Sequence, residues 1–196
     1  MTSYNIHITG VGGQGIGLLS QALLRAVDHA GIRAMAVDTH GLAQRGGVVV
    51  SRIRCGETAH SPLTFSGSAD LVLGMEMHEA LRSFKSALAK DGILVYLSVS
   101  WQPLPVRLGE CPAIEPRDIE AACRAAGIRA IQVDTRNLSD ARTQNMALLG
   151  TISKHGLVPG VAIDHYRAAL EDLLAGAMLT SNMAVFDTYA NTIQTG

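Results

Sequence analysis

The chain has 196 residues, of which 47% are hydrophobic and 17% are charged, and its formal net charge is −1 at pH 7. That length fits one domain with enough chain to bury a core. A near-neutral chain gives no electrostatic case for nucleic acid or a membrane surface, and no apolar run approaches the roughly 20 residues that span a bilayer. The first residues lead into a strand-like segment without the basic start and apolar run of a secretory signal, so we expect a cytoplasmic protein.

The cysteines and histidines do not form a metal-binding pattern. Cys55, Cys111 and Cys123 include no Cys-x-x-Cys pair, and an iron–sulfur cluster takes about four thiolates. The seven histidines are not spaced to place two ligands on one helical face. We therefore expect no metal on this chain.

Predicted strands and helices alternate along the first two thirds of the chain, and helices follow to its end. Strands are expected at 4–9, 33–38, 48–54, 71–73, 93–99 and 128–133, and helices at 16–30, 116–126, 141–154, 162–174 and around 181–191. A further helix is expected to carry Leu81, Phe84 and Leu88 and to end at Asp91-Gly92. This order indicates an α/β fold: a single Rossmann-like layered domain with a mainly parallel sheet and a helical C-terminal portion.

The first strand leads into a glycine-rich loop with the sequence GVGGQG, residues 10–15. Gly10, Gly12 and Gly15 have the spacing G-x-G-x-x-G between a strand and a helix, where free amides and the helix dipole favour an anion such as phosphate. Asp38 ends the second strand, where a dinucleotide-binding domain places its ribose-binding acid. An NAD(P)-dependent dehydrogenase is therefore one interpretation, and a purely structural turn is another.

Two features go beyond what a dinucleotide site needs. Gly13 and Gln14 make the tip of the first loop more flexible and more polar than phosphate contact requires. Asp38 is followed at once by a second glycine-rich segment, THGLAQRGG, residues 39–47. This segment combines an imidazole, an amide, a guanidinium suited to phosphate or carboxylate, and glycines that allow close approach: His40, Gln44, Arg45, Gly46 and Gly47.

Arg52 and Arg54 lie two residues apart on the next predicted strand, so their side chains project to one face. They either form a local basic patch with Arg45 or cover a solvated strand face. A basic patch on a near-neutral chain suggests an anionic ligand or an acidic partner surface.

The two glycine-rich segments together resemble the gamma component of 2-oxoacid:ferredoxin oxidoreductases. The His and Gln of the second segment make it most similar to the beta subunit of indolepyruvate:ferredoxin oxidoreductase. Weaker matches at residues 145–150 and 182–186 extend the resemblance over most of the chain. The resemblance implies one gamma-type domain, residues 1–196, in a complex that oxidatively decarboxylates a 2-oxoacid to an acyl-CoA, with indolepyruvate or another aryl-pyruvate among the candidate substrates.

In that family, thiamine diphosphate, magnesium and iron–sulfur clusters pass electrons from the oxoacid to ferredoxin, and coenzyme A is the co-substrate. This chain has no cysteine cluster and no Gly-Asp-Gly segment followed by the Asn of a thiamine diphosphate–magnesium site. The resemblance therefore implies a non-redox subunit that is inactive alone, has no catalytic residue of its own, and assembles with a large subunit that holds these cofactors. The residues expected to face that subunit's active site are Gly10, Gly12, Gly13, Gln14, Gly15, His40, Gln44, Arg45, Gly46 and Gly47. A non-catalytic binding or scaffolding module is the other alternative, beside the dehydrogenase.

Overall fold

The protein is built around a six-stranded sheet with the strand order β2-β3-β1-β4-β5-β6. A computed structural model describes residues 1–40, 47–101, 106, 108–110 and 112–191. The strands are β1 (Tyr4–Val11), β2 (Ala34–His40), β3 (Val48–Cys55), β4 (Ala69–Gly74), β5 (Leu88–Leu97) and β6 (Arg129–Val133). β1, β4, β5 and β6 pair in parallel, whereas β3 runs antiparallel to both of its neighbours, β1 and β2. The predicted α/β fold with a mainly parallel sheet is confirmed, with one reversed strand inserted in it.

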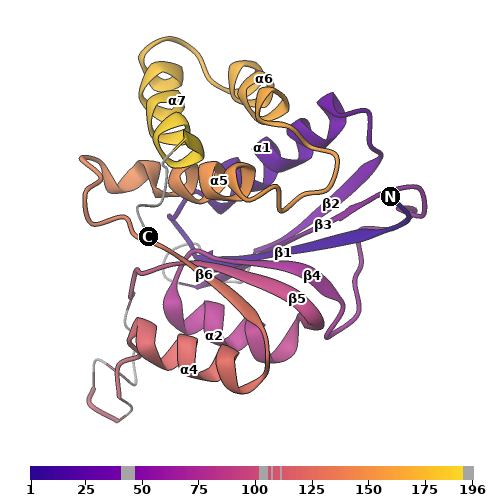
Figure 1. The fold of residues 1–196 in the computed structure, drawn as a ribbon. Coiled ribbons are helices and arrows are strands. Elements are labelled where there is room, and N and C mark those ends of the chain that lie inside the picture. Colours follow the sequence, from indigo (N-terminus) through magenta and orange to yellow (C-terminus); the bar gives the residue numbers. More distant parts are fainter. Residues whose placement is uncertain (41–46, 102–105, 107, 111, 192–196) are drawn as a thin grey trace.

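Helices cover the sheet on both faces (Figure 1). On one face lie α1 (Ile16–His29), α5 (Gln144–Lys154), α6 (Ile163–Leu173) and α7 (Gly176–Asn191), and on the other lie α2 (Met77–Ser86) and α4 (Pro116–Ala125). A short 3₁₀ turn, η1 (Ala141–Thr143), precedes α5. Within the described residues, none of the helices combines the length and the apolar run that crossing a bilayer takes. The helical C-terminal portion is confirmed, and its last helix begins five residues before the predicted start.

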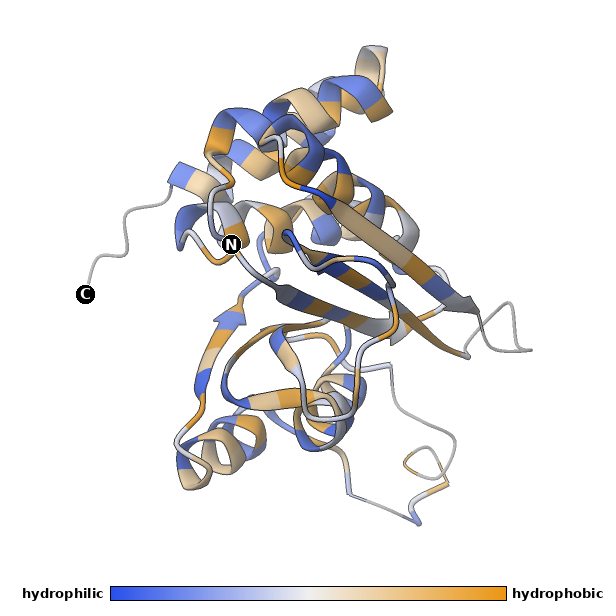
Figure 2. Cartoon of the chain, turned by 90° about the vertical axis from the view of Figure 1, so that its right-hand side faces the viewer, coloured by the Kyte–Doolittle hydropathy of each residue, from blue (hydrophilic) through white to orange (hydrophobic). Residues whose placement is uncertain are grey.

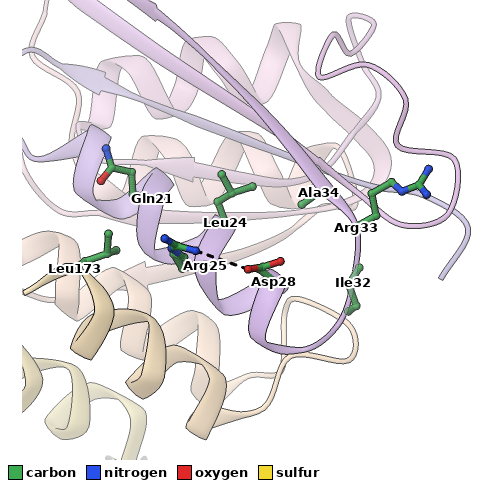
Figure 3. Close-up of a pocket in the computed structure, with 8 residues that line it drawn as sticks. All are labelled: Gln21, Leu24, Arg25, Asp28, Ile32, Arg33, Ala34 and Leu173. Carbon is green, nitrogen blue, oxygen red and sulfur yellow. Dashed lines mark ion pairs between the residues drawn. The ribbon is translucent and has the colours of Figure 1, made fainter.

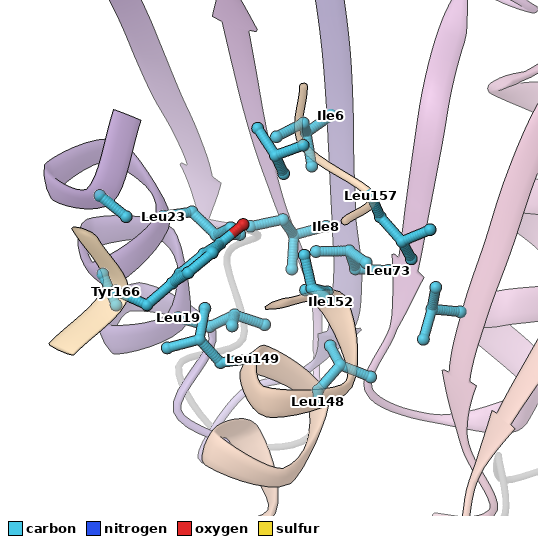
Figure 4. Close-up of a cluster of buried hydrophobic side chains, with 14 of the residues drawn as sticks. Ile6, Ile8, Leu19, Leu23, Leu73, Leu148, Leu149, Ile152, Leu157 and Tyr166 are labelled. Carbon is cyan, nitrogen blue, oxygen red and sulfur yellow. The ribbon is translucent and has the colours of Figure 1, made fainter. Parts of the chain in front are cut away.

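The larger core lies between the sheet and the α1, α5, α6 and α7 layer (Figure 4). Ile6 and Ile8 project from β1 onto Leu19 and Leu23, which recur one turn apart on α1. Each is essentially unexposed, and burying a side chain of this size contributes about 1.5–3 kcal/mol. Figure 4 also shows the contributions of β4, α5, α6 and the segment after α5: Leu73, Leu148, Leu149, Ile152, Leu157 and Tyr166. This packing fixes α1, and with it the first glycine loop, against the sheet.

The prediction that Leu88 belongs to a helix ending at Asp91-Gly92 is wrong. α2 ends at Ser86, and Leu88 begins β5, where it pairs with Ala69 of β4. A Cβ on Gly92 would lie 2.8 Å from the carbonyl oxygen of Ala69. Gly92 therefore allows β5 to approach β4 where the register of the two strands shifts, and it does not terminate a helix.

Candidate functional site

The sheet has a topological switch point between β1 and β4. α1 leads from β1 to β2 on one face, whereas α2 leads from β4 to β5 on the other face (Figure 1). In α/β sheets, ligands usually bind beyond the carboxyl ends of the strands at such a point. The first glycine loop, which connects β1 to α1, lies at this position.

Gln14 joins the two strands that flank the switch point. Its side chain is only 3% exposed, its Oε1 accepts a hydrogen bond from Val11 N at 2.7 Å, and its Nε2 donates to the carbonyl oxygen of Met75 at 2.7 Å. A Cβ on Gly10 would lie 2.7 Å from Gln14 Oε1, so glycine leaves the room that this amide takes. The amide is thus committed to closing the loop, in the place where a dinucleotide would bring its pyrophosphate.

Asn145 holds the same loop from the other side. Asn145 Nδ2 donates to the carbonyl oxygen of Gly15 at 3.4 Å, and its side chain is 1% exposed. Gly15 is the N-cap of α1, with φ 78° and no side-chain cap, and Gly13 has φ 102°. Among the described residues, the backbone N–H groups of Gly13 and Gly15 have no acceptor. An uncapped helix N-terminus with free amides is suited to an anion.

The two glycine-rich segments meet in space. Gly12 N donates to the carbonyl oxygen of Gly47 at 3.0 Å, because β3, which begins beside Gly47, pairs along β1. The second segment forms the connection between β2 and β3, which pair antiparallel. Gln44, Arg45 and Gly46 lie outside the described residues, as does the side chain of His40. Gly47, in the part of the second segment that the structure describes, is therefore in contact with the first segment.

Asp38 is not isolated at the end of β2. Its Oδ1 accepts a long hydrogen bond of 3.5 Å from Ser20 Oγ of α1, and Ser20 Oγ lies 2.7 Å from Ser51 Oγ of β3. These contacts direct the carboxylate toward α1 and its hydroxyl pair. The acid that the dehydrogenase interpretation assigned to a ribose thus contributes to holding α1 on the β2–β3 pair.

A crevice of about 280 Å³ opens at the carboxyl ends of β1, β5 and β6, beside the first glycine loop. Gly13 and Gln14 form one wall, and Trp101, which is 50% exposed, follows β5. The remaining lining residues are Val99, Thr135, Leu138, Ala141, Arg142 and Gln144. Sequence reasoning did not single out these residues. The available signal was their position: Trp101 and Thr135 each follow the carboxyl end of a predicted parallel strand, and such ends share one edge of a sheet.

Glu76 connects the loops after β4 and β5. Its side chain is 1% exposed. Oε2 accepts a hydrogen bond from Glu79 N at 3.0 Å and so caps α2. Oε1 accepts a hydrogen bond from Trp101 N at 3.1 Å and lies 2.8 Å from His78 Nδ1. One buried carboxylate thereby fixes the start of α2 and the backbone of Trp101. Glu79, which is also buried, has a raised pKa because burial disfavours its charged form.

Hollows larger than this crevice lie elsewhere on the described part of the chain. A groove of about 560 Å³ is formed by α1, the amino end of β2 and Leu173 of α6 (Figure 3). Its opposite charges, Arg25 and Asp28, pair with each other across 3.8 Å. The sequence-predicted site residues that the structure describes do not line this groove. Its volume alone therefore gives no chemical reason to prefer it to the crevice.

The described thiols are poor ligands. Cys55 and Cys123 are buried in separate cores on opposite sides of the sheet. Burial raises the pKa of Cys55 to about 12 and also raises the pKa of Cys123. Cys111 lies outside the described residues. In the part of the chain that the structure describes, no group of three or more His, Cys, Asp and Glu side chains is placed to hold a metal ion.

Comparisons with known proteins give one consistent family. The sequence pattern of the pyruvate ferredoxin/flavodoxin oxidoreductase family matches residues 5–191. Indolepyruvate oxidoreductase subunit IorB of Thermococcus kodakarensis is 32% identical over 162 residues, which cover 79% of this chain and 78% of that protein. The IorB subunit of Archaeoglobus fulgidus is 28% identical over 183 residues, 91% of this chain and 90% of that protein.

Solved structures share the fold. Pyruvate oxidoreductase subunit PORC of Thermotoga maritima superposes with a TM-score of 0.65 at 18% identity, covering 97% of this chain and 96% of that chain. A 2-oxoglutarate:ferredoxin oxidoreductase of Magnetococcus marinus, solved with 2-oxoglutarate, coenzyme A and succinyl-CoA bound, gives a TM-score of 0.65 at 16% identity, and the match covers all of this chain but 32% of that one. The chain belongs to the pyruvate ferredoxin/flavodoxin oxidoreductase family and is a subunit of an oxidoreductase of that family.

Proposed function

We propose that this chain is the non-redox, gamma-type subunit of a 2-oxoacid:ferredoxin oxidoreductase and that its carboxyl-edge loops complete an active site centred on a large partner subunit. The observation that carries the proposal is the contact between the two glycine-rich segments, Gly12 N to Gly47 O, at the switch point of the sheet. Family membership supports the reaction class. The names of the relatives favour indolepyruvate or another aryl-pyruvate as the oxoacid.

In this proposal, thiamine diphosphate, magnesium and the iron–sulfur clusters belong to the large subunit, which passes the electrons to ferredoxin. The buried positions of Cys55 and Cys123 support this division, because cluster ligation requires accessible thiolates that lie close together. The chain's own contribution is positional. Gln14 and Asn145 hold the first loop, in which the N–H groups of Gly13 and Gly15 have no acceptor among the described residues.

Coenzyme A is the anion that these amides are proposed to face. Its phosphates suit free backbone donors at a helix N-terminus, and the adjacent crevice adds Trp101 as an aromatic surface. Arg45, which lies outside the described residues, is proposed from the sequence to add a guanidinium to the same edge. The Magnetococcus marinus relative with coenzyme A bound supports a coenzyme A-dependent reaction in structures of this fold.

The reaction is tested by co-expressing the chain with the large subunit from the same organism. The isolated chain should show no turnover, and the complex should reduce a viologen dye only when a 2-oxoacid and coenzyme A are both present. Indolepyruvate should give a higher kcat/KM than pyruvate or 2-oxoglutarate. Activity of the isolated chain, or an assembled complex that is inactive with every 2-oxoacid, would contradict the proposal.

The coenzyme site has its own reporter, because Trp101 is the single tryptophan of the chain. Coenzyme A should quench the tryptophan emission of the isolated chain, whereas pantetheine, which lacks the phosphates, should quench it far less. Arg45→Ala should assemble normally and raise the apparent KM for coenzyme A. Equal quenching by both compounds, or none, would remove the phosphates from this crevice.

A further inference from the structure

The paired strands β2 and β3 are covered by a helix on one face. Ile53 of β3 is buried against α1 on that face. On the other face, α2 packs on β4, β5 and β1, and α4 packs on β6. α2 contacts β1 through Ser83, whose Oγ lies 3.2 Å from His7 Nε2. In Figure 2, β2 and β3 run on beyond this layer to the grey trace at the right of the view.

Four side chains define the surface that none of the described helices covers, which we call the open sheet face: Met35 and Val37 of β2, and Arg52 and Arg54 of β3. The strand register makes them cross-strand neighbours, with Met35 opposite Arg54 and Val37 opposite Arg52. Met35 is 38% exposed. An arrangement of apolar side chains next to arginines is the composition typical of the centre of a protein–protein interface.

The connection from β3 to β4 starts and ends at the edge of the sheet where β2 begins, and it adds exposed apolar side chains there. The connection from β3 to β4 carries Leu63 and Phe65, which are 64% and 85% exposed. Gly67 N of this connection donates to the carbonyl oxygen of Ser86 at 3.1 Å, which holds it against the end of α2. Leu63 and Phe65 therefore add exposed apolar area at the same end of the sheet as Met35, and exposed apolar area of this kind is typical of interaction surfaces.

The charge of the open sheet face is uncompensated. Among the described residues, neither Arg52 nor Arg54 forms an ion pair, and the one side-chain hydrogen bond is a long contact of 3.4 Å from Arg54 Nε to Ser3 Oγ. Arg82, on the bordering helix, instead pairs with Glu79. Burial and the charge of Arg52 lower the pKa of His7 to about 4, so His7 is neutral at physiological pH. The face therefore presents two guanidinium groups that can donate hydrogen bonds to carboxylates of another protein.

We propose that the open sheet face docks the cofactor-bearing subunit of the complex, through an apolar surface of that subunit whose carboxylates pair with Arg52 and Arg54. This rests on the proposed function, which supplies the partner. A second copy of this chain fits less well, because a two-fold contact through this face would set the arginines of one copy against those of the other. In the Magnetococcus marinus relative the matched region is 32% of a longer chain, so there the same fold is joined to further domains.

The open sheet face is continuous with the first glycine loop through β3. β3 continues from Arg52 back to Val48 and Gly47, whose carbonyl oxygen binds Gly12 of the first loop. Docking on β2 and β3 would therefore bring the partner to the border of the carboxyl-edge crevice. The same contact that holds the subunits together would orient the glycine loops toward the partner's cofactors.

The test uses the assembled complex. The double variant Arg52→Glu/Arg54→Glu should bind the large subunit at least ten-fold more weakly than the unmodified chain. The control is Lys90→Glu/Arg129→Glu, the same change in charge at exposed residues of β5 and β6, and it should bind within two-fold of the unmodified chain. Circular dichroism and Tm of each variant check the fold. If the glutamates unfold the chain, they are replaced by Arg52→Gln/Arg54→Gln, which removes both charges, keeps an N–H donor at each position and should also weaken binding.

A second measurement needs no variant. Oxidative footprinting should show Met35 protected in the complex relative to the isolated chain, while Met178 of α7, 61% exposed, should react equally in both. Unchanged affinity of both arginine variants, with Met35 equally reactive in an active complex, would overturn the docking surface and leave the proposed function standing. A homodimer that the glutamates dissociate would assign the face to a second copy. Failure of the unmodified chain to bind the large subunit would instead remove the proposed function.

Discussion

The carboxyl edge and the open sheet face adjoin at the Gly12–Gly47 hydrogen bond, yet their polar groups have opposite surroundings. At the carboxyl edge, Gln14, Glu76 and Asn145 are buried, and each bonds to backbone groups of a neighbouring loop. On the open sheet face, Arg52 and Arg54 are half-buried and have no ion-pair partner among the described residues.

This difference distinguishes residues that hold a loop in place from residues that can contact a partner. A polar side chain whose hydrogen bonds are satisfied within the chain stabilises one loop geometry. Few of its donors and acceptors remain for a ligand. A guanidinium beside exposed apolar side chains has its capacity unused and gains most from a partner. Gln14, which belongs to a loop that resembles a ligand site, thus serves to hold that loop in place. Arg52 and Arg54, which belong to an ordinary strand, have hydrogen-bond donors left for a partner.

The largest expected effect comes from Gln14→Leu, which keeps the volume but removes the amide. Val11 N and Met75 O would lose their partners in a buried position, and each buried unsatisfied group costs about 1–3 kcal/mol. We expect the free energy of unfolding to fall by about 2–4 kcal/mol, measured by urea denaturation. Gln21→Leu on the exposed side of α1 is the matched control, with an expected change within about 0.5 kcal/mol. Equal effects of the two changes would show that Gln14 is not a structural residue.

His7 lies at the border between the two regions, and it makes stability depend on pH. Its pKa is lowered to about 4 in the folded chain by burial and by Arg52, against 6.5 for the unperturbed group. Between these values the unfolded chain binds the proton and the folded chain does not, so stability is complete above about pH 6.5 and falls toward pH 4. The difference in pKa corresponds to a loss of about 3 kcal/mol.

Comparison of the unmodified chain with His7→Gln measures this loss, because Gln keeps a donor for Ser83 and cannot titrate. The variant should lose less stability between pH 6.5 and 4. Glu79, whose raised pKa acts in the opposite direction, is present in both proteins and cancels in the comparison. Arg52→Gln should have a smaller effect of the same sign, by removing one cause of the lowered pKa. Parallel stability curves for His7→Gln and the unmodified chain would contradict the assignment.

The sequence predicted the elements and the two glycine segments because both are local patterns. Helical spacing located α1, and a turn of four glycines in six residues located the loop after β1. The direction of β3 was not predicted, since alternation along a strand does not depend on whether its neighbour runs parallel or antiparallel. Leu88 was misplaced because a short apolar run after a helix fits either structure.

The contacts that fix the candidate site could not be predicted in the same way. Gln14 binds Met75, 61 residues away, and Asn145 binds Gly15, 130 residues away. A single polar residue with one distant partner leaves no periodic signal in one sequence. His7 of β1 likewise has its partner, Ser83 of α2, 76 residues away. The local glycine pattern therefore located the loops, whereas the roles of Gln14 and Asn145 depend on hydrogen bonds to distant residues.

The smallest effect on stability, and the most specific readout, is expected for Glu76→Ala. Loss of the α2 cap costs about 1 kcal/mol, and the unpaired N–H of Trp101 adds to this, so we expect about 1–2 kcal/mol in total. Because Glu76 also holds the backbone of the chain's single tryptophan, the emission maximum of Trp101 should shift. Asp118→Ala, which removes an exposed cap at α4 by losing the hydrogen bond from Glu115 N, should cost a similar amount of stability and leave the Trp101 emission unchanged. If both variants leave the emission maximum where it was, Glu76 caps a helix and does not position the crevice wall.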